Sequence, residues 1–203
     1  MASDESRLSI TDLLAAARGA DPQAFDRLFA RYRNYLRLLA QDWLDRAFRG
    51  KADPSDLVQE TLLEAHQGFA AFQGSDEPEF VSWLRQIMAR NVTDFVRRYR
   101  SAARNVGREE PSPDARIVDR LQLLAGTLQS SPSHSAQRRE MGVVLADAMA
   151  ELSPGHREVI RLRNLQNLSW PEIAQRMGRS EEAARKLWIR ALVHLKPLIE
   201  SRL

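Results

Sequence analysis

The sequence predicts an all-α protein with two helical domains joined by a flexible linker, the second of them a helix-turn-helix domain. Apolar residues recur at helical spacing, and no segment of four or more residues alternates apolar and polar side chains as a strand does. The dipeptides Asp-Pro and Ser-Pro, which favour helix starts, precede several of these apolar patterns. A stretch rich in proline and serine interrupts the helical pattern, and 203 residues are enough for two small domains.

The first domain is expected over residues 9–100, after a disordered N-terminus at residues 1–8. Asp21 and Asp53 are each followed by proline, which places an N-cap directly before the first helical position. Gly19 ends the short amphipathic helix that comes before Asp21. The helices expected in this domain span residues 9–18, 22–48, 54–71 and 79–100, with a loop over residues 73–78.

The linker is expected over residues 101–137. Pro111, Pro113 and Pro132 interrupt the helical period there, and serine is frequent in the second half of the segment. The second domain is expected over residues 138–203. Its helices are expected over residues 138–150 and 154–164, followed by the helix-turn-helix.

Two short helices joined by a tight turn are predicted over residues 167–190. Ser169 and Glu172 have the spacing of a capping box for the first helix, and Gly178 stands where the chain must leave that helix with a positive φ. Ser180 then caps the second helix. That helix carries Arg185, Lys186 and Arg190 beside an apolar stripe of Ala184, Leu187 and Ala191. This pattern is typical of a helix-turn-helix with a basic recognition helix for the major groove.

The composition excludes several classes of function. The chain has no cysteine, so it has neither a disulfide framework nor a thiolate metal site, and its four histidines are not spaced as metal ligands. The N-terminus is polar and acidic, unlike a secretory signal, and no apolar run approaches the roughly 20 residues that span a bilayer. We therefore expect a soluble, cytoplasmic protein with no metal and no cofactor. The formal net charge of +3 does not by itself indicate a polyanionic partner, so the distribution of charge matters more.

The fourth helix and the residues after it carry a strong cluster of positive charge. Between Arg85 and Arg108 there are seven arginines and one acidic residue, Asp94. Arginines can follow phosphates, and the interleaved aromatic residues offer faces on which unpaired bases can stack. Alternatively, the aromatic residues are core, which is the role we favour for Trp83 and Phe95, and the arginines complement the helix dipole. Seven arginines exceed what the dipole requires, so this helix is a candidate nucleic-acid surface.

The third helix carries the opposite charge. Asp53, Asp56, Glu60 and Glu64 are three or four residues apart, so they share one face of the helix together with Gln59. They form either an acidic docking strip or an ordinary solvated face with acids in its first turn. Taken alone, the pattern favours the solvated face.

Three segments carry a resemblance to a known family. Residues 53–65 read DPSDLVQETLLEA, residues 80–98 read FVSWLRQIMARNVTDFVRR, and residues 152–163 read LSPGHREVIRLR before the helix-turn-helix. In this order they resemble the polymerase-binding helix, the −10 melting and reading segment, and the −35-reading domain of extracytoplasmic-function (ECF) sigma-70-type initiation factors. The resemblance covers residues 9–200 apart from the linker, and the three motifs together are specific to that family.

The resemblance implies roles for individual residues. The implied polymerase contacts are Asp53, Asp56, Gln59 and Glu60, and Ser55 departs from the acid that many members of the family have at its position. The implied −10 DNA contacts are Phe80, Trp83, Arg90, Asn91, Asp94, Arg97 and Arg98. The implied −35 DNA contacts are Ser180, Arg185, Lys186, Ile189 and Arg190. The loop over residues 73–79 matches one that captures a flipped non-template base.

The implied protein is an alternative sigma factor and not an enzyme. Its expected partners are core RNA polymerase and promoter DNA, and the resemblance allows an anti-sigma factor as a further partner. An operator-binding regulator is the first rival, because it would use the same helix-turn-helix without the acidic strip. A nucleic-acid enzyme is the second, but no second acidic cluster or histidine obviously converges on the acids of the third helix.

Overall fold

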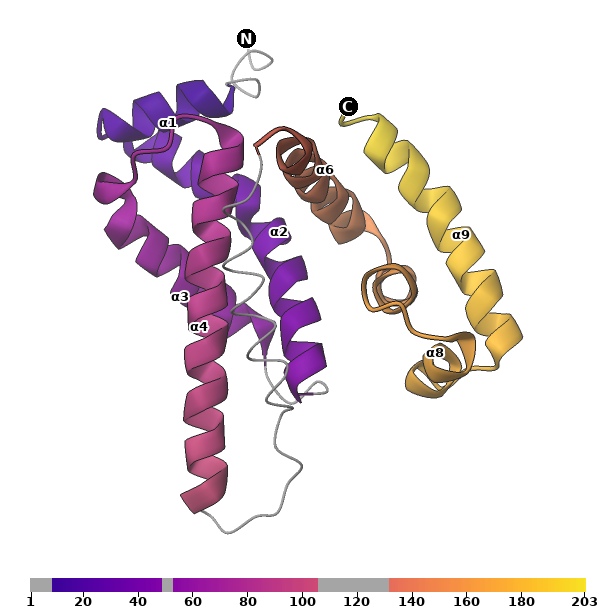
Figure 1. The fold of residues 1–203 in the computed structure, drawn as a ribbon. Helices are drawn as coiled ribbons and strands as arrows, with labels where there is room; N and C mark the ends of the chain where they lie inside the picture. The colour runs from indigo at the N-terminus through magenta and orange to yellow at the C-terminus, as the bar shows by residue number, and fades with distance from the viewer. Residues whose placement is uncertain (1–8, 49–52, 106–131) are drawn as a thin grey trace. The chain divides into compact units, whose positions relative to one another are not determined.

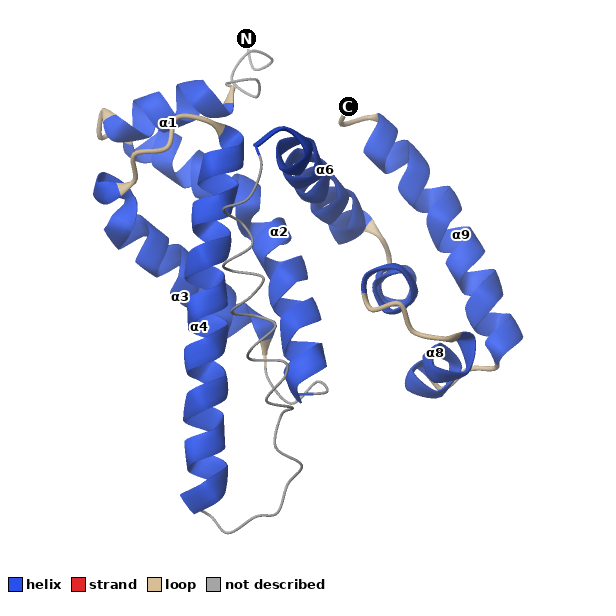
Figure 2. Cartoon of the chain, in the orientation of Figure 1, coloured by secondary structure: helices blue, strands red, loops and turns tan. Residues whose placement is uncertain are grey.

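The computed structural model describes residues 9–48, 53–105 and 132–203, and the regular secondary structure in these residues is helical throughout (Figure 2). The expected N-terminal segment and most of the expected linker lie outside the described residues. The chain divides into two compact units, Met1–Glu140 and Met141–Leu203. The expected all-α fold with two domains is therefore confirmed. None of the helices among the described residues has the length and apolar character needed to cross a membrane.

The first unit is built on long helices that pack side by side (Figure 1). Their bounds are α1 (Ile10–Arg18), α2 (Pro22–Phe48), α3 (Pro54–Gly68) and α4 (Glu77–Asn105), with a 3-10 turn at Phe69–Ala71. Helix α1 packs on α2, while α3 packs against both α2 and α4. The N-cap predicted at Asp53 is present, because the Asp53 carboxylate accepts a hydrogen bond from the Ser55 backbone N–H at 2.8 Å.

The core of this unit is centred on an aromatic cluster between α2, α3 and α4. Tyr32 and Phe80 are completely buried, and their ring centroids are 5.2 Å apart in an edge-to-face arrangement. Phe72 stacks on Trp83 with a centroid distance of 4.8 Å, and Phe29 meets Phe80 edge to face at 5.8 Å. Because aromatic pairs bury large areas and favour these geometries, they fix how α4 sits on the other helices.

The second unit contains the C-terminal part of α6 and the helix-turn-helix. Its elements are α6 (Pro132–Glu151), which begins in the first unit, α7 (Pro154–Ile160), a π-helical turn at Arg161–Leu165, α8 (Trp170–Met177) and α9 (Glu181–Glu200). Helices α7 and α8 both pack against α9. The core includes Leu162, Ile173 and Ala184, each completely buried.

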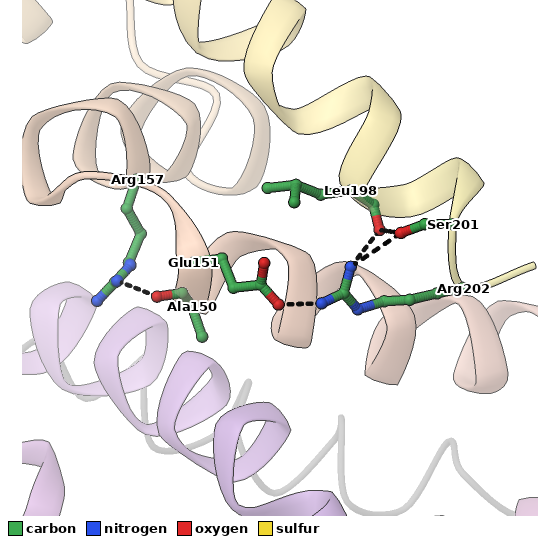
Figure 3. A network of polar contacts seen from close by, with 6 residues as sticks. All are labelled: Ala150, Glu151, Arg157, Leu198, Ser201 and Arg202. Carbon is green, nitrogen blue, oxygen red and sulfur yellow. Dashed lines mark hydrogen bonds and ion pairs between the residues drawn. The ribbon is translucent and has the colours of Figure 1, made fainter. Parts of the chain in front are cut away.

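Two arginines fasten α6 to the rest of the second unit (Figure 3). Arg157 of α7 donates to the carbonyl oxygens of Met149 and Ala150, at 2.9 and 2.6 Å. These carbonyls belong to the last turn of α6, where helical partners are lacking. Arg202, just after α9, forms an ion pair with Glu151. Arg157 and Arg202 therefore connect α7 and the residues after α9 to the end of α6.

Several helix bounds differ from those expected, and α4 also begins at Glu77 rather than at residue 79. Helix α4 continues to Asn105, since no proline or glycine follows Arg98 until Gly107 and two alanines favour the helix. Helix α6 begins at Pro132, because proline is well suited to the first helical position, where its missing N–H has no partner to lose. Both ends of the expected linker are thus helical. Pro197 lies inside α9, which continues to Glu200.

Candidate functional site

The acidic residues predicted on the third helix lie along α3 as expected from their spacing. Asp56, Gln59 and Glu60 are exposed. Asp53 is also exposed, but it is occupied as the N-cap. The hydrogen bond from the Ser55 backbone N–H, helped by the Ser55 side chain, holds the pKa of the Asp53 carboxyl below its ordinary value. Asp53 therefore keeps its charge while stabilising the start of α3.

Arginines of α4 lie across from these acids. Arg98 Nη2 is 3.5 Å from Glu60 Oε1, and Arg90 forms an ion pair with Glu64. The side chains of Arg90 and Arg98 are 59% and 64% exposed, so both pairs are at the surface and screened by solvent. The structure thus brings the predicted acidic strip and the predicted basic surface together on one side of the first unit.

The other polar residues predicted on α4 divide into exposed and buried ones. Arg97 is exposed, and its Nη1 is 3.7 Å from Asp94 Oδ1 one turn earlier. Asn91 is buried, and its amide nitrogen donates to the Thr61 hydroxyl on α3 at 3.2 Å. Arg85, half-buried, donates to the Tyr35 hydroxyl at 2.9 Å. Asn91 and Arg85 therefore hold α4 against its neighbours, leaving Arg90, Arg97 and Arg98 as its outward cations among the side chains that are described.

The aromatic residues of α4 are mainly structural. Phe80 has no exposed surface, which corrects its assignment as a DNA contact: its position in the sequence matches a DNA-binding segment, but its ring packs between Phe29, Tyr32 and Phe72. Trp83 is half-buried against Phe72, in agreement with the core role favoured for it. Trp83 keeps some exposed surface, whereas Phe80 cannot meet a base as it lies.

The loop before α4 is held in one conformation by polar contacts. It covers residues 73–76, because Glu77 already belongs to α4. The Glu79 carboxylate accepts from the Ser75 backbone N–H at 2.7 Å, and the Asp76 carboxylate accepts from the Glu79 backbone N–H at 2.8 Å. Asp76 thus acts as the N-cap of α4, while Glu79 reaches back one residue further, to Ser75. The loop therefore presents exposed polar side chains on a fixed backbone.

Arg18 is a part of this site that the sequence analysis missed. From the last turn of α1 its guanidinium donates to the carbonyl oxygen of Gly74 and, at 3.5 Å, to that of Phe72. Its Cζ also lies 5.8 Å from the centroid of the Phe72 ring. No local pattern indicates this role, since the partners are more than fifty residues further along the chain.

The helix-turn-helix has the capping geometry that its sequence predicts. The Glu172 carboxylate accepts from the Ser169 hydroxyl at 2.6 Å and from the Ser169 backbone N–H at 2.8 Å, and these bonds lower the pKa of Glu172. Gly178 has φ 60° and ψ 39°, the left-handed conformation expected of it. Ser180 caps α9 by accepting from the Ala183 backbone N–H at 3.2 Å.

The predicted recognition residues form an exposed face at the start of α9. Arg185, Lys186, Ile189 and Arg190 are all exposed, as is the capping residue Ser180. Within the helix, Arg185 Nη2 is 3.7 Å from Glu181 Oε2, and Lys186 Nζ is 2.6 Å from Glu182 Oε1. These surface pairs are weak enough to exchange for phosphate or base contacts. Among the described residues, no group of three or more side chains is arranged to hold a metal ion.

Comparison with known proteins identifies the family. The family model described as ECF sigma factor matches residues 7–196. The ECF RNA polymerase sigma factor BldN of Streptomyces coelicolor is 29% identical over 200 residues, which cover 98% of this chain and 69% of BldN. The RNA polymerase sigma factor CarQ of Myxococcus xanthus is 31% identical over 184 residues, which cover 90% of this chain and 92% of CarQ.

A solved structure, that of CnrH in complex with the cytosolic domain of CnrY, matches 94% of this chain and 97% of the compared chain at 26% identity, with a TM-score of 0.36. The family match over residues 7–196 includes α3, α4 and the helix-turn-helix. The chain belongs to the ECF sigma factor family.

Proposed function

We propose that this alternative sigma factor uses neighbouring surfaces of its first unit for core RNA polymerase and for the −10 element, and its helix-turn-helix for the −35 element. The observation that carries the proposal is the pairing of α3 acids with α4 arginines, Glu60 with Arg98 and Glu64 with Arg90. Because the two charged surfaces adjoin, DNA bound along α4 would lie next to the polymerase bound at α3.

The polymerase contact is proposed on the exposed face of α3. Asp56, Gln59 and Glu60 project from consecutive turns of this helix and are exposed. A basic partner surface would complement them, and charge complementarity gives both orientation and a fast association rate. Asp53 contributes mainly by capping α3, so its part in the contact is indirect.

The −10 contact is proposed on the outward cations of α4 and the preceding loop. Arg90, Arg97 and Arg98 would meet phosphates of the opened strand, with Asp94 orienting Arg97. Asn91 and Trp83 would support this surface from their buried and half-buried positions. The loop over residues 73–76 would receive a base that leaves the stack, which costs a few kcal/mol of unstacking.

The −35 contact is proposed on the start of α9 in the major groove. Arg185 and Arg190 would contact base edges or phosphates, and Lys186 a phosphate, while Ile189 would supply an apolar contact and Ser180 the helix N-cap. In this scheme residues 9–100 act as the polymerase and −10 domain and residues 138–203 as the −35 domain.

The chain itself would have no catalytic activity, since the free energy for opening DNA would come from binding. The protein would act in the cytoplasm, where polymerase and promoter DNA meet. An anti-sigma factor that covers the polymerase-binding surface is a further proposed partner. An operator-binding regulator would differ by binding promoter duplex tightly without polymerase.

The test is promoter binding by the full chain with and without core polymerase, together with transcription from the same promoter. We expect specific binding and transcription only with core enzyme. Asp56→Arg with Glu60→Arg should abolish co-purification with core enzyme, because the reversed charges repel a basic partner, while circular dichroism stays unchanged. Asp26→Arg, an exposed acid of α2, is the control. Undiminished co-purification of the double variant would contradict the polymerase assignment.

A further inference from the structure

Trp170, the first residue of α8, connects the two helices of the helix-turn-helix through an arginine. The Arg185 Cζ atom of α9 lies over the Trp170 ring, 5.1 Å from its centroid. A guanidinium at this distance is attracted by the electron-rich face of the indole. Arg185, the proposed −35 reader on α9, therefore stacks on a side chain of α8.

Arg185 needs such support, because the contact within its own helix is weak. Its Nη2 is 3.7 Å from Glu181 Oε2, and the two side chains are 54% and 49% exposed. Exposed pairs at this spacing contribute little, and an arginine side chain has much rotamer freedom to lose on binding. The stack on Trp170 limits that freedom before any DNA arrives.

The Trp170 ring is itself contacted from two segments, α9 and the π-helical turn, and these contacts are braced by further hydrogen bonds. The Trp188 ring of α9 meets it edge to face at a centroid distance of 5.7 Å. The Arg163 Cζ atom lies 4.8 Å from the Trp170 centroid, and Arg163 Nη1 donates to the Leu168 carbonyl at 2.8 Å. Trp188 Nε1 donates to Asn164 Oδ1 at 2.9 Å. Trp170 is thus a built platform, held by Arg163 of the π-helical turn and by Trp188 of α9.

We propose that Trp170 is a positioning residue for −35 recognition, which holds the Arg185 guanidinium in a binding-competent orientation. A guanidinium that lies over a ring keeps the N–H donors of its edge available for a base or a phosphate. Fewer rotamers are lost when the complex forms, so affinity and discrimination both increase. This inference rests on the proposed role of Arg185.

The opposing interpretation is that Trp170 only packs α8 against α9. Trp170→Leu distinguishes the packing role from the positioning role, because leucine keeps an apolar side chain against Trp188 but removes the aromatic face. Trp170→Phe keeps an aromatic face and should restore function. Arg190, on the same exposed part of α9, has no stacking contact with Trp170 among those found and serves as the comparison residue.

The experiment measures affinities of the holoenzyme for a panel of promoters with single substitutions in the −35 element. The variants are Trp170→Leu, Trp170→Phe, Arg185→Ala and Arg190→Ala, with the two double variants that combine Trp170→Leu with each arginine change. Thermal melting followed by circular dichroism checks that each variant is folded. We expect Trp170→Leu to reduce discrimination about three-fold, at the same base pairs that Arg185→Ala affects, and Trp170→Phe to restore it.

The double variants decide the matter. Trp170→Leu should add nothing to Arg185→Ala but should multiply with Arg190→Ala, because Trp170 acts through Arg185 alone. If Trp170→Leu multiplies equally with both, or if it weakens all promoters alike while Arg185→Ala changes discrimination, the positioning role is wrong while the proposed function stands. If Arg185→Ala itself changes nothing, the proposed role of Arg185 is wrong and the positioning role fails with it.

Discussion

Arg98 of α4 and Glu60 of α3 form an ion pair, with 3.5 Å between Arg98 Nη2 and Glu60 Oε1. One belongs to the proposed DNA surface and the other to the proposed polymerase surface. A polymerase that draws Glu60 away would leave Arg98 free for a phosphate. The pair would then link the two proposed binding events, by an amount limited to that of an exposed ion pair.

Removing the charge of Glu60 should have opposite effects on the two partners. We expect Glu60→Gln to tighten binding of the isolated chain to single-stranded DNA about two-fold, since Arg98 no longer has a competing carboxylate. The same change should weaken binding to core polymerase. Fluorescence anisotropy with labelled DNA measures the first effect, and Asp26→Asn controls for the change in net charge. Equal tightening by both variants would mean that only the overall charge matters.

Arg18 should control the order of the loop over residues 73–76. Arg18→Met keeps most of the side-chain length but removes the donors to the Gly74 and Phe72 carbonyls. We expect about five-fold faster amide exchange in the loop, with little change in the melting temperature, because the contact is at the surface. Opening of the −10 element should decrease while −35 discrimination is kept. Arg27→Met, an exposed change on α2, should leave exchange in the loop unaltered.

Two glycines of the second unit should respond differently to alanine. Gly178 has φ 60°, and an added Cβ would meet nothing within 4 Å, so Gly178→Ala acts through the left-handed backbone alone. We expect it to lower the free energy of unfolding by about 1 kcal/mol. Gly155 lies in α7 with open space and no left-handed backbone, so Gly155→Ala should be neutral or slightly stabilising. Urea denaturation of both variants gives the comparison, and equal effects would contradict it.

The helix-turn-helix should lose some stability in acid through Glu172. Its pKa is lowered below the ordinary 4.5, first by the Ser169 hydroxyl and then by the Ser169 backbone N–H. A carboxyl whose pKa is lower when folded contributes stability above its unfolded pKa, and this is lost as the pH falls through the folded pKa. Glu172→Gln and Ser169→Ala should both flatten the fall of the melting temperature below pH 4.5. An unchanged profile in both variants would exclude this contribution.

Features that depend on residues close together in the chain could be predicted from the sequence. The capping contacts of Ser169 with Glu172 and the left-handed Gly178 join residues within a few positions, so the sequence pattern contains both partners. The same holds for the helix starts at Pro22 and Pro54 and for the acidic face of α3. Proline positions are not decided by local signals alone, because Pro132 begins α6 whereas Pro197 lies inside α9.

Periodicity, caps and motif spacing are local properties, so the helical fold, the helix-turn-helix and the family motifs could be predicted from the residue order. The burial of Phe80 and Asn91 depends on the packing of the helices, because a DNA-facing residue and a core residue can occupy similar positions of one helical period. The tertiary structure likewise decided that Arg18 holds a distant loop and that Arg98 faces Glu60. It also placed Trp170 beneath Arg185. Each of these contacts joins segments far apart in the chain, and their geometry depends on how side chains fill the space between them.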